Sequence, residues 1–507
     1  MGSAPSRRDA GVRRRPVMAA ALTGLALLAG CDPRTPDPEP DPGPTRLDQP
    51  ARCDEASPGA AAPTSTAPAV VGTSVVGTTW AGMPVSQCLL TAKARQYVAY
   101  YDADRTMTLA QRDVAEDGTA GDTWKRRRVG STLGWDSHDD VTMAVDRAGA
   151  LHVAGNMHGD PLVYLRTGPD GDITGVSRVR TMVSAGTEQE VTYPVFLRGL
   201  DGTLFFYYRD GRSGAGATYM NRYEEETGRW ERATPGRLFD GADRNAYQTR
   251  PALGPDGRFH MLWVWRDTID VATTSMLEYA RTSDFRTWEA ADGTRLELPF
   301  TYGNGDVIDP VPEGEGLVNG LQAVGFAEDG TPVVSYEKDD EDGSLQLWGA
   351  TPVDGGGWEV TQMTAWDNPV EVSGTGTLDL EFDLQAPRVE TAGTLAVPYS
   401  CGGKGLTLTV DPELGYVSQQ PRSSAYPAEL LQITGKDEGL APRIIEDLGP
   451  GHGLTPRRRY VLRWESLGVN GDQPRDSWPQ QGSQLTVVDL GETEDQQAAP
   501  VPQDGEG

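Results

Sequence analysis

Residues 256–265 of the chain read DGRFHMLWVW, a tight turn followed directly by an unbroken apolar strand. Glycine adopts positive φ without steric cost, so Asp-Gly favours a turn, and the apolar run is typical of a buried strand. The same pattern returns at intervals of about 53 to 73 residues, a period typical of repeat folds. The other copies are Gly149 before Leu151–Val153, Gly202 before Leu204–Tyr208, Gly330 before Val333–Tyr336, and Gly393 before Leu395–Val397.

A second marker, a tryptophan just after a turn, recurs with the same rhythm. Its copies are Trp124, Trp230, Trp288 and Trp358. Periods of this size with several short strands are typical of propeller blades, because one sheet buries both faces only when neighbouring sheets stack on it. Dividing residues 78–490 by the period predicts an all-β, seven-bladed β-propeller, with a β-sandwich or a solenoid as the alternatives.

Composition excludes one broad class of function. The 507 residues include 74 acidic and 45 basic side chains, a formal net charge of −29. Proteins that bind nucleic acid by neutralising phosphates need the opposite balance, so we expect no nucleic-acid partner. The 61 glycines and 37 prolines favour a turn-rich all-β chain. We expect a monomer.

The N-terminal residues predict export. Five arginines precede an apolar run from Met18 to Gly30, which is followed by Cys31. This pattern is typical of a bacterial lipoprotein signal with an acylated cysteine, and an ordinary signal peptide is the alternative. We therefore predict a cell-envelope protein that contacts the membrane only through lipid at Cys31. The predicted divisions are a signal peptide at 1–30, the acylated cysteine and a disordered Pro/Asp-rich linker at 31–77, the propeller at 78–490, and a disordered acidic tail at 491–507.

Three cysteines remain after Cys31 is assigned to lipid. An oxidising compartment permits one disulfide among Cys53, Cys88 and Cys401. Pairing of Cys88 with Cys401 would join the two ends of the body, but the spacing leaves the choice open.

The candidate chemistry lies between residues 135 and 250. His138 and His158 stand one hairpin apart, where two imidazoles can occupy successive strand ends and meet at the mouth of a central channel. Tyr193, Arg209 and Tyr247 follow in the next repeats.

Together with their neighbours, these residues match a known pattern. The matching segments are Tyr97–Asp102, Gly134–His138, Gly155–His158, Tyr193-Pro194, Tyr208–Gly211, Trp263–Thr268 and Arg459–Glu465. In this order they resemble the BNR-repeat family that contains the ulvan lyases. The resemblance implies a seven-bladed propeller that cleaves an acidic, sulfated polysaccharide by β-elimination at a uronic acid.

The reaction explains why such residues are needed. Elimination removes the C5 proton beside the uronate carboxylate, whose negative charge must first be neutralised. By resemblance, Arg209 helped by Tyr247 neutralises the carboxylate, and His158 positions the substrate. His138 and Tyr193 serve as base and acid, with either assignment open. The scheme needs no cofactor and no metal.

Two features of the chain depart from the resemblance. Family members carry a structural zinc on a histidine of the Trp-Val-Trp strand, but this chain keeps His260 and has Val271 and Ser275 where further ligands would fall. We therefore predict no zinc, and we interpret His152, His260 and His452 as structural. The acidic balance also disfavours a heavily sulfated substrate, unless the basic runs Lys125–Arg128 and Arg457–Arg459 compensate locally.

Two other functions compete with a lyase. One is a non-catalytic, surface glycan-binding propeller. The other is a sialidase-like glycoside hydrolase, because Ser283–Trp288 faintly resembles the Asp-box of such propellers.

Overall fold

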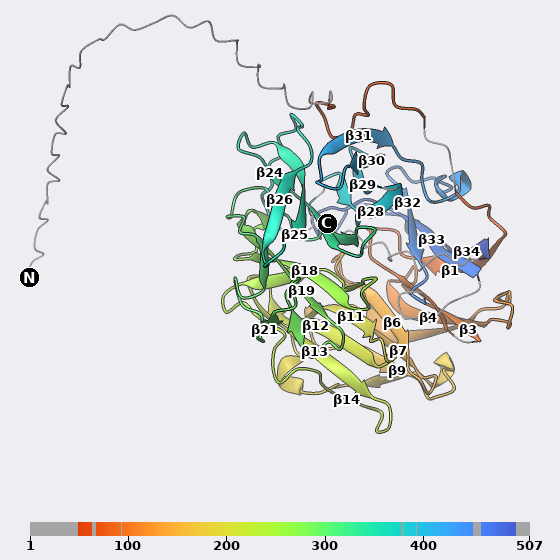
Figure 1. Ribbon diagram of the computed structural model, residues 1–507. Coiled ribbons are helices and arrows are strands. Elements are labelled where there is room, and N and C mark those ends of the chain that lie inside the picture. The colour runs from red at the N-terminus through yellow and green to blue at the C-terminus, as the bar shows by residue number, and fades with distance from the viewer. Residues whose placement is uncertain are drawn as a thin grey trace, which may run out of the picture. The chain divides into compact units, whose positions relative to one another are not determined.

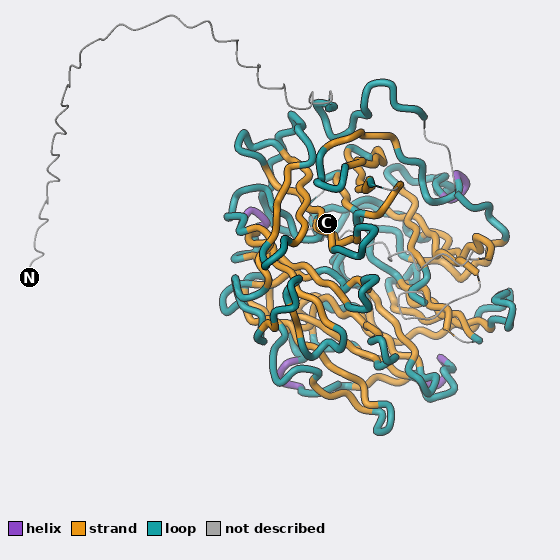
Figure 2. Tube along the Cα trace, viewed as in Figure 1, coloured by secondary structure: helices purple, strands orange, loops and turns teal. Residues whose placement is uncertain are grey.

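The computed structural model describes residues 49–62, 67–92, 94–376, 378, 380–391, 393–449 and 458–492. Antiparallel strands dominate these ranges, and the helices within them are short 3-10 turns (Figure 2). They are η1 (Ile173–Gly175), η2 (Ala185–Thr187), η3 (Val271–Thr273) and η4 (Ala428–Leu430). Within the same ranges no helix has the length and apolarity needed to cross a membrane. The predicted signal peptide, Cys31 and His452 lie outside the described residues.

The described strands form seven sheets, and the first three follow one another from orange to yellow-green in Figure 1. The first sheet contains β2 (Cys88–Ala92), β3 (Arg95–Tyr101), β4 (Thr106–Asp113) and β5 (Lys125–Thr132). The second contains β6 (Val141–Val145), β7 (Leu151–Gly155), β9 (Tyr164–Arg166) and β10 (Ser177–Val179). The third contains β8 (His158–Asp160), β11 (Val191–Arg198), β12 (Leu204–Arg212), β13 (Ala215–Glu224), β14 (Arg229–Arg232) and β15 (Phe239–Asp240).

The next three sheets continue in the same sense from green to blue (Figure 1). The fourth contains β16 (Asn245–Gln248), β17 (Ala252–Leu253), β18 (Phe259–Arg266), β19 (Thr274–Thr282), β20 (Trp288–Glu289), β21 (Arg295–Leu296) and β22 (Asp306–Asp309). The fifth contains β23 (Gln322–Phe326), β24 (Pro332–Asp339), β25 (Leu345–Pro352) and β26 (Trp358–Gln362). The sixth contains β27 (Phe382–Leu384), β28 (Arg388–Thr391), β29 (Thr394–Cys401), β30 (Lys404–Val410) and β31 (Tyr416–Pro421).

The seventh sheet joins the two ends of the described chain. Its strands are β1 (Gly72–Thr79), β34 (Ser483–Glu492), β33 (Arg458–Ser466) and β32 (Ala441–Glu446), and β1 pairs antiparallel with β34. The prediction of an all-β propeller is confirmed. The predicted count of seven blades is not confirmed. Six blades are each built from strands that are near neighbours in the chain, and the closing sheet instead joins strands from both ends.

The sequence repeat corresponds to a repeated hairpin. The turn glycines immediately precede the second long strand of successive sheets, and all of them have positive φ: Gly149, Gly202, Gly257, Gly330 and Gly393. A side chain at these positions would strain the backbone, which is why glycine recurs. The tryptophan marker lies at or just before an outer strand, at β5, β14, β20 and β26.

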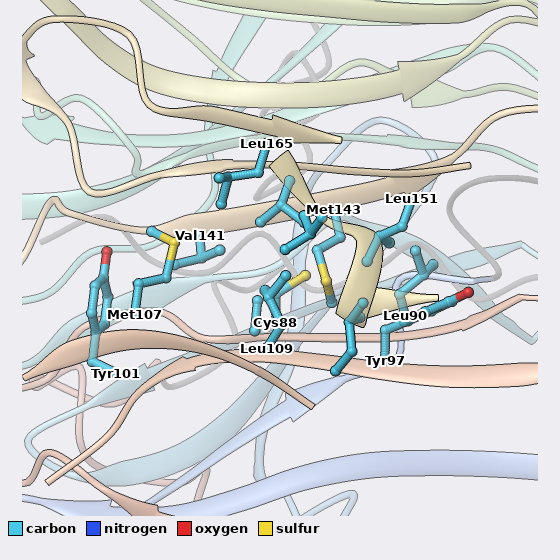
Figure 3. Packing of buried hydrophobic residues seen from close by; sticks show 14 of the residues in the cluster. Cys88, Leu90, Tyr97, Tyr101, Met107, Leu109, Val141, Met143, Leu151 and Leu165 are labelled. Carbon is cyan, nitrogen blue, oxygen red and sulfur yellow. The ribbon is translucent and has the colours of Figure 1, made fainter. Parts of the chain in front are cut away.

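The core lies between neighbouring sheets rather than at one centre. Figure 3 shows one such layer, in which Cys88, Leu90 and Leu109 of the first sheet face Met143 and Leu165 of the second. All five side chains are at most 4% exposed. Burial of each large apolar side chain contributes about 1.5–3 kcal/mol to the stability of the fold. Because many such side chains interlock between two sheets, their packing fixes the angle between adjacent sheets.

The folded body begins earlier than predicted. Cys53 forms a disulfide with Cys401 at the end of β29, which resolves the pairing that the sequence left open. The Cys53 carbonyl also accepts a hydrogen bond from the Tyr399 hydroxyl at 2.9 Å. The predicted linker at 31–77 therefore includes ordered residues, because residues 49–62 pack on the sixth sheet and β1 belongs to the closing sheet. Cys88 is buried and takes no part in this disulfide.

Candidate functional site

The loop between β5 and β6 carries the first predicted site histidine. Within it, a carboxylate oxygen of Asp136 accepts a hydrogen bond from the His138 backbone amide at 3.0 Å. Asp472, in the loop between β33 and β34, accepts bonds from the backbone amide and hydroxyl of Ser137 at 2.9 and 2.7 Å. A local turn and a contact from the closing sheet together hold His138 in place.

The second histidine reaches the same point from the neighbouring strand. His158 begins β8, which pairs with β11 opposite Thr192. Its Nδ1 lies 2.5 Å from Oδ2 of Asp136, while Nδ1 of His138 lies 2.7 Å from Oδ1. The two imidazole centroids are 4.4 Å apart. One carboxylate therefore holds both predicted imidazoles side by side.

A β-bulge brings Tyr193 to these rings. The register between β11 and β12 shifts between Thr192 and Val195, and Tyr193 has a φ of 53°. A bulge re-aims side chains, and a non-glycine residue with positive φ costs of order 1–3 kcal/mol, so both features are typical of functional sites. The ring of Tyr193 lies 6.1 Å from the centroids of both His138 and His158.

Arg209 lies on the opposite side of Tyr193. It is only 4% exposed, and its guanidinium carbon is 5.0 Å from the Tyr193 ring and 5.8 Å from the Tyr247 ring. Its Nη1 donates to the Tyr247 hydroxyl at 3.5 Å. Within the described residues no acidic side chain forms an ion pair with Arg209. A buried cation without a carboxylate partner is costly, and an anionic ligand would relieve that cost.

Tyr247 connects this arginine to a second one. Its hydroxyl accepts a hydrogen bond from Nη2 of Arg266 at 2.7 Å and lies 3.0 Å from Oγ of Ser213. Burial by itself would raise the pKa of Tyr247, but the charges of Arg209 and Arg266 hold that pKa below its usual value. The phenolic oxygen is thus polarised by two cations.

The five residues singled out in the sequence therefore converge, and two further residues belong with them. Asp136 and Arg266 stand inside the matching segments but were not assigned a role from the sequence. The only sequence signal for Asp136 is its position two residues before His138. No periodicity could show that Arg266, at the end of β18, reaches the hydroxyl of Tyr247.

A cavity of about 220 Å³ continues from the tyrosine and arginine side of the site. Tyr193, Arg209 and Tyr247 line it together with residues from six sheets and the loops between them, among them Asp140, Arg250, Gln322, Tyr426 and Glu446. Contributions from so many sheets place it along the axis that the sheets surround. His138 and His158 are not among its lining residues, but both rings lie 6.1 Å from the ring of Tyr193, which lines it.

Two aspartates in the histidine loop have pKa values shifted in opposite directions. Burial would raise the pKa of Asp136, but hydrogen bonds from His138 and His158 hold it well below its usual range. Burial, together with the charges of Asp136 and Asp160, raises the pKa of Asp139 to about 7. Asp136 is therefore ionised at neutral pH, whereas Asp139 is partly protonated.

Two places in the described chain bear on metal binding. Within the described residues, Asp136, His138 and His158 are the group whose donor atoms all lie within 4.8 Å of one another. The zinc position implied by the resemblance does not fit this chain, because both ring nitrogens of His260 have partners. Its Nδ1 lies 2.6 Å from the Tyr279 hydroxyl and its Nε2 lies 3.0 Å from Asp256.

The remaining basic and histidine candidates serve the structure. His152 is fully buried, with Tyr164 and Asp146 at its two nitrogens. In the run Lys125–Arg128, each side chain contacts a carboxylate or a backbone carbonyl. Arg458 and Arg459 pair with Asp489 and Glu446, and Arg457 lies outside the described residues. Four of these six described side chains are therefore ion-paired, whereas Arg126 and Arg127 contact backbone carbonyls.

The chain matches one protein family over about half of its length and two curated proteins over short segments. The model of a BNR repeat-containing family matches residues 95–366. Two curated relatives, both named "Ulvan lyase, long isoform", match short segments. The protein from Glaciecola sp. (strain KUL10) is 39% identical over 67 residues, and that from Alteromonas sp is 35% identical over 66 residues. Each match covers 13% of this chain but only 6% and 7% of the respective relative.

Solved structures resemble the chain over a much greater length. The polysaccharide lyase Uly1 has a TM-score of 0.54 and 14% identity, covering 83% of this chain and 99% of that one. A PL25 ulvan lyase bound to -[GlcA(1-4)Rha3S]- has a TM-score of 0.51 and 11% identity, covering 82% of this chain and 95% of that one. At these identities the likeness shows a shared fold.

Proposed function

The chain belongs to the BNR repeat-containing family, and from that premise we propose that it is a polysaccharide lyase that cleaves a uronic-acid-containing, ulvan-like polysaccharide by β-elimination. The observation that carries the proposal is Arg209, a buried cation without an acidic partner in the described chain, directly beside Tyr193 and Tyr247. The structural neighbours that are polysaccharide lyases support the same reaction class.

Arg209 neutralises the uronate carboxylate. A guanidinium presents parallel N–H donors that match a carboxylate, and burial strengthens the attraction by excluding water. Tyr247, held by Arg266, adds a hydroxyl donor on the same side. Once the carboxylate charge is balanced, the C5 proton is acidic enough to be removed.

His138 and Tyr193 transfer the protons. One takes the C5 proton and the other protonates the oxygen that leaves C4, after which a C4=C5 double bond remains. Their rings lie 6.1 Å apart, which leaves room for one sugar carbon to contact both groups. His158 binds the substrate beside them.

The polysaccharide is proposed to be uronate-rich and at most moderately sulfated. The −29 net charge repels a polyanion, and Lys125, Arg128, Arg458 and Arg459 of the two basic runs are paired with neighbouring carboxylates. Among the described residues, Arg209 and Arg266 beside the cavity form no ion pair with an acidic side chain, and these two cations suit one carboxylate per binding position rather than a dense array of sulfates.

The test follows the conjugated product. The protein is incubated with ulvan, desulfated ulvan and other polyuronates, and the ultraviolet absorbance of the unsaturated uronate is recorded. We expect a rise in absorbance that Arg209→Ala, His138→Ala and Tyr193→Phe each reduce by at least about 10³-fold, as expected when a transition-state interaction is lost. Arg128→Ala, which removes a paired surface cation on β5, is the matched control and should retain the wild-type rate.

Two results would redirect the proposal. Binding of a polyuronate without any rise in absorbance would indicate the non-catalytic, glycan-binding alternative. New reducing ends without unsaturation would indicate a glycoside hydrolase. Retention of more than about a tenth of the rate in either Arg209→Ala or His138→Ala would remove that residue from the catalytic set.

We further propose that lipid on Cys31 anchors the protein to the cell envelope. Labelled fatty acid should be incorporated into the wild-type protein but not into Cys31→Ser, and that variant should leave the membrane fraction. Unlabelled, membrane-bound wild-type protein would contradict the anchor.

A further inference from the structure

The Asp136 carboxylate contacts both imidazoles of the site. Oδ1 lies 2.7 Å from Nδ1 of His138, and Oδ2 lies 2.5 Å from Nδ1 of His158. An ionised carboxylate can only accept hydrogen bonds, so each of these nitrogens must carry a hydrogen. A neutral ring with its hydrogen on Nδ1 has its lone pair on Nε2.

We propose that Asp136 is a positioning residue that fixes both His138 and His158 in the Nδ1–H tautomer, so that the lone pair of each ring is on Nε2. The inference rests on the proposed lyase function for its catalytic meaning, although the tautomers themselves do not depend on it. Sharing one carboxylate also couples the rings. Any movement of Asp136 displaces the proton-transfer residue and the substrate-binding residue together.

The closing sheet supports this arrangement. Asp472 holds Ser137 through two hydrogen bonds, and its Oδ2 lies 3.6 Å from Nδ1 of His138. A cluster of three tryptophans packs the same two loops together. It consists of Trp80, Trp135 and Trp478, with ring centroids 5.2–5.7 Å apart. The loop that carries Asp136 is therefore fixed from outside the site, as a positioning residue requires.

Nitrogen NMR of the histidine rings tests the proposal without substrate. The chain has only five histidines, so selective labelling gives a spectrum in which single-histidine substitutions can assign each ring. In the wild-type protein at a pH where the rings are neutral, we expect both His138 and His158 to carry hydrogen on Nδ1. An Nε2–H tautomer in either ring would refute the proposal.

Asp136→Asn is the decisive variant. Its amide has one acceptor oxygen and one donor nitrogen, so it cannot accept from both rings, and at least one ring should change to the Nε2–H tautomer. Asp117→Asn is the matched control, because it removes the same charge from an exposed turn between β4 and β5 and should leave both rings unchanged. Unchanged tautomers in Asp136→Asn would also refute the proposal.

The kcat and KM of Asp136 variants test whether Asp136 acts on proton transfer through the two histidines. Asp136→Asn should lower kcat by about 10²–10⁴-fold, as expected for a tautomer error at a proton-transfer residue, and should raise KM as far as His158 loses its contact with the substrate. Asp136→Glu, which restores a carboxylate, should recover part of kcat. Unchanged kcat in Asp136→Asn would exclude a positioning role. If no polyuronate yields unsaturated product, the lyase proposal fails, while the NMR experiment still decides the role of Asp136.

Discussion

Replacement of Asp139 by asparagine should stabilise the protein increasingly as the pH rises from about 4 to about 7. Asp139 is 6% exposed, and burial with the charges of Asp136 and Asp160 raises its pKa from the usual 3.8 to about 7. Between these two values the folded protein keeps a proton that the unfolded chain has released. The free energy of unfolding therefore falls as pH rises through this window.

The size of the effect follows from the shift. Each pKa unit corresponds to about 1.36 kcal/mol, so a shift of about three units makes the ionised Asp139 cost at most about 4 kcal/mol above pH 7. Asparagine has nearly the same shape and carries no charge. It can still accept the hydrogen bond from the Gly134 backbone amide that the carboxylate receives.

Urea unfolding at pH 4.5 and pH 8 measures the difference. The unfolding free energies of wild type and Asp139→Asn should differ by at most about 1 kcal/mol at pH 4.5, and the variant should be more stable by about 2–4 kcal/mol at pH 8. Asp117→Asn controls for the loss of one negative charge. A stability difference that is the same at both pH values would refute the reasoning, because it would show that ionisation of Asp139 plays no part.

Three further predictions concern the disulfide, the histidine pair and the buried core histidine. Reduction of the Cys53–Cys401 disulfide, or Cys53→Ser, should lower the free energy of unfolding by about 2–4 kcal/mol, measured by thermal denaturation. An unchanged Tm would show that anchoring residues 49–62 contributes nothing to stability. Added Zn²⁺ should reversibly inhibit the proposed lyase activity, because it competes with protons at Asp136, His138 and His158. EDTA should restore activity, and inhibition that persists equally in Asp136→Asn would argue against this site. Burial lowers the pKa of His152 despite the opposing effect of Asp146. Below about pH 6.5 the unfolded chain therefore takes up a proton that the folded protein does not, and the free energy of unfolding should fall as the pH decreases from 6.5. His152→Asn should reduce the slope of unfolding free energy against pH.

Much of the fold was accessible from the repeat. The turn glycines and the apolar strands after them identified successive hairpins, because positive φ and strand burial are local requirements that each blade must meet separately. The predicted start of the folded body at residue 78 was too late, because the residues before it are held by long-range contacts rather than by a local pattern. The order of residues 49–62 depends on the disulfide to Cys401 and on contacts with the sixth sheet, and nothing near Cys53 in the sequence indicates them.

The candidate site divides in the same way. His138, His158, Tyr193, Arg209 and Tyr247 could be chosen because the proposed chemistry requires those side-chain types and the matching segments contain them. Their convergence depends on a bulge at Tyr193, on β8 pairing across to β11, and on the packing of neighbouring sheets. The sequence by itself determined an acidic, repeat-built all-β protein with these side chains in order, since composition and period are local properties. Only the tertiary structure decided that Asp136 holds two imidazoles and that Arg209 is buried without an acidic partner, because both depend on distances between residues far apart in the chain.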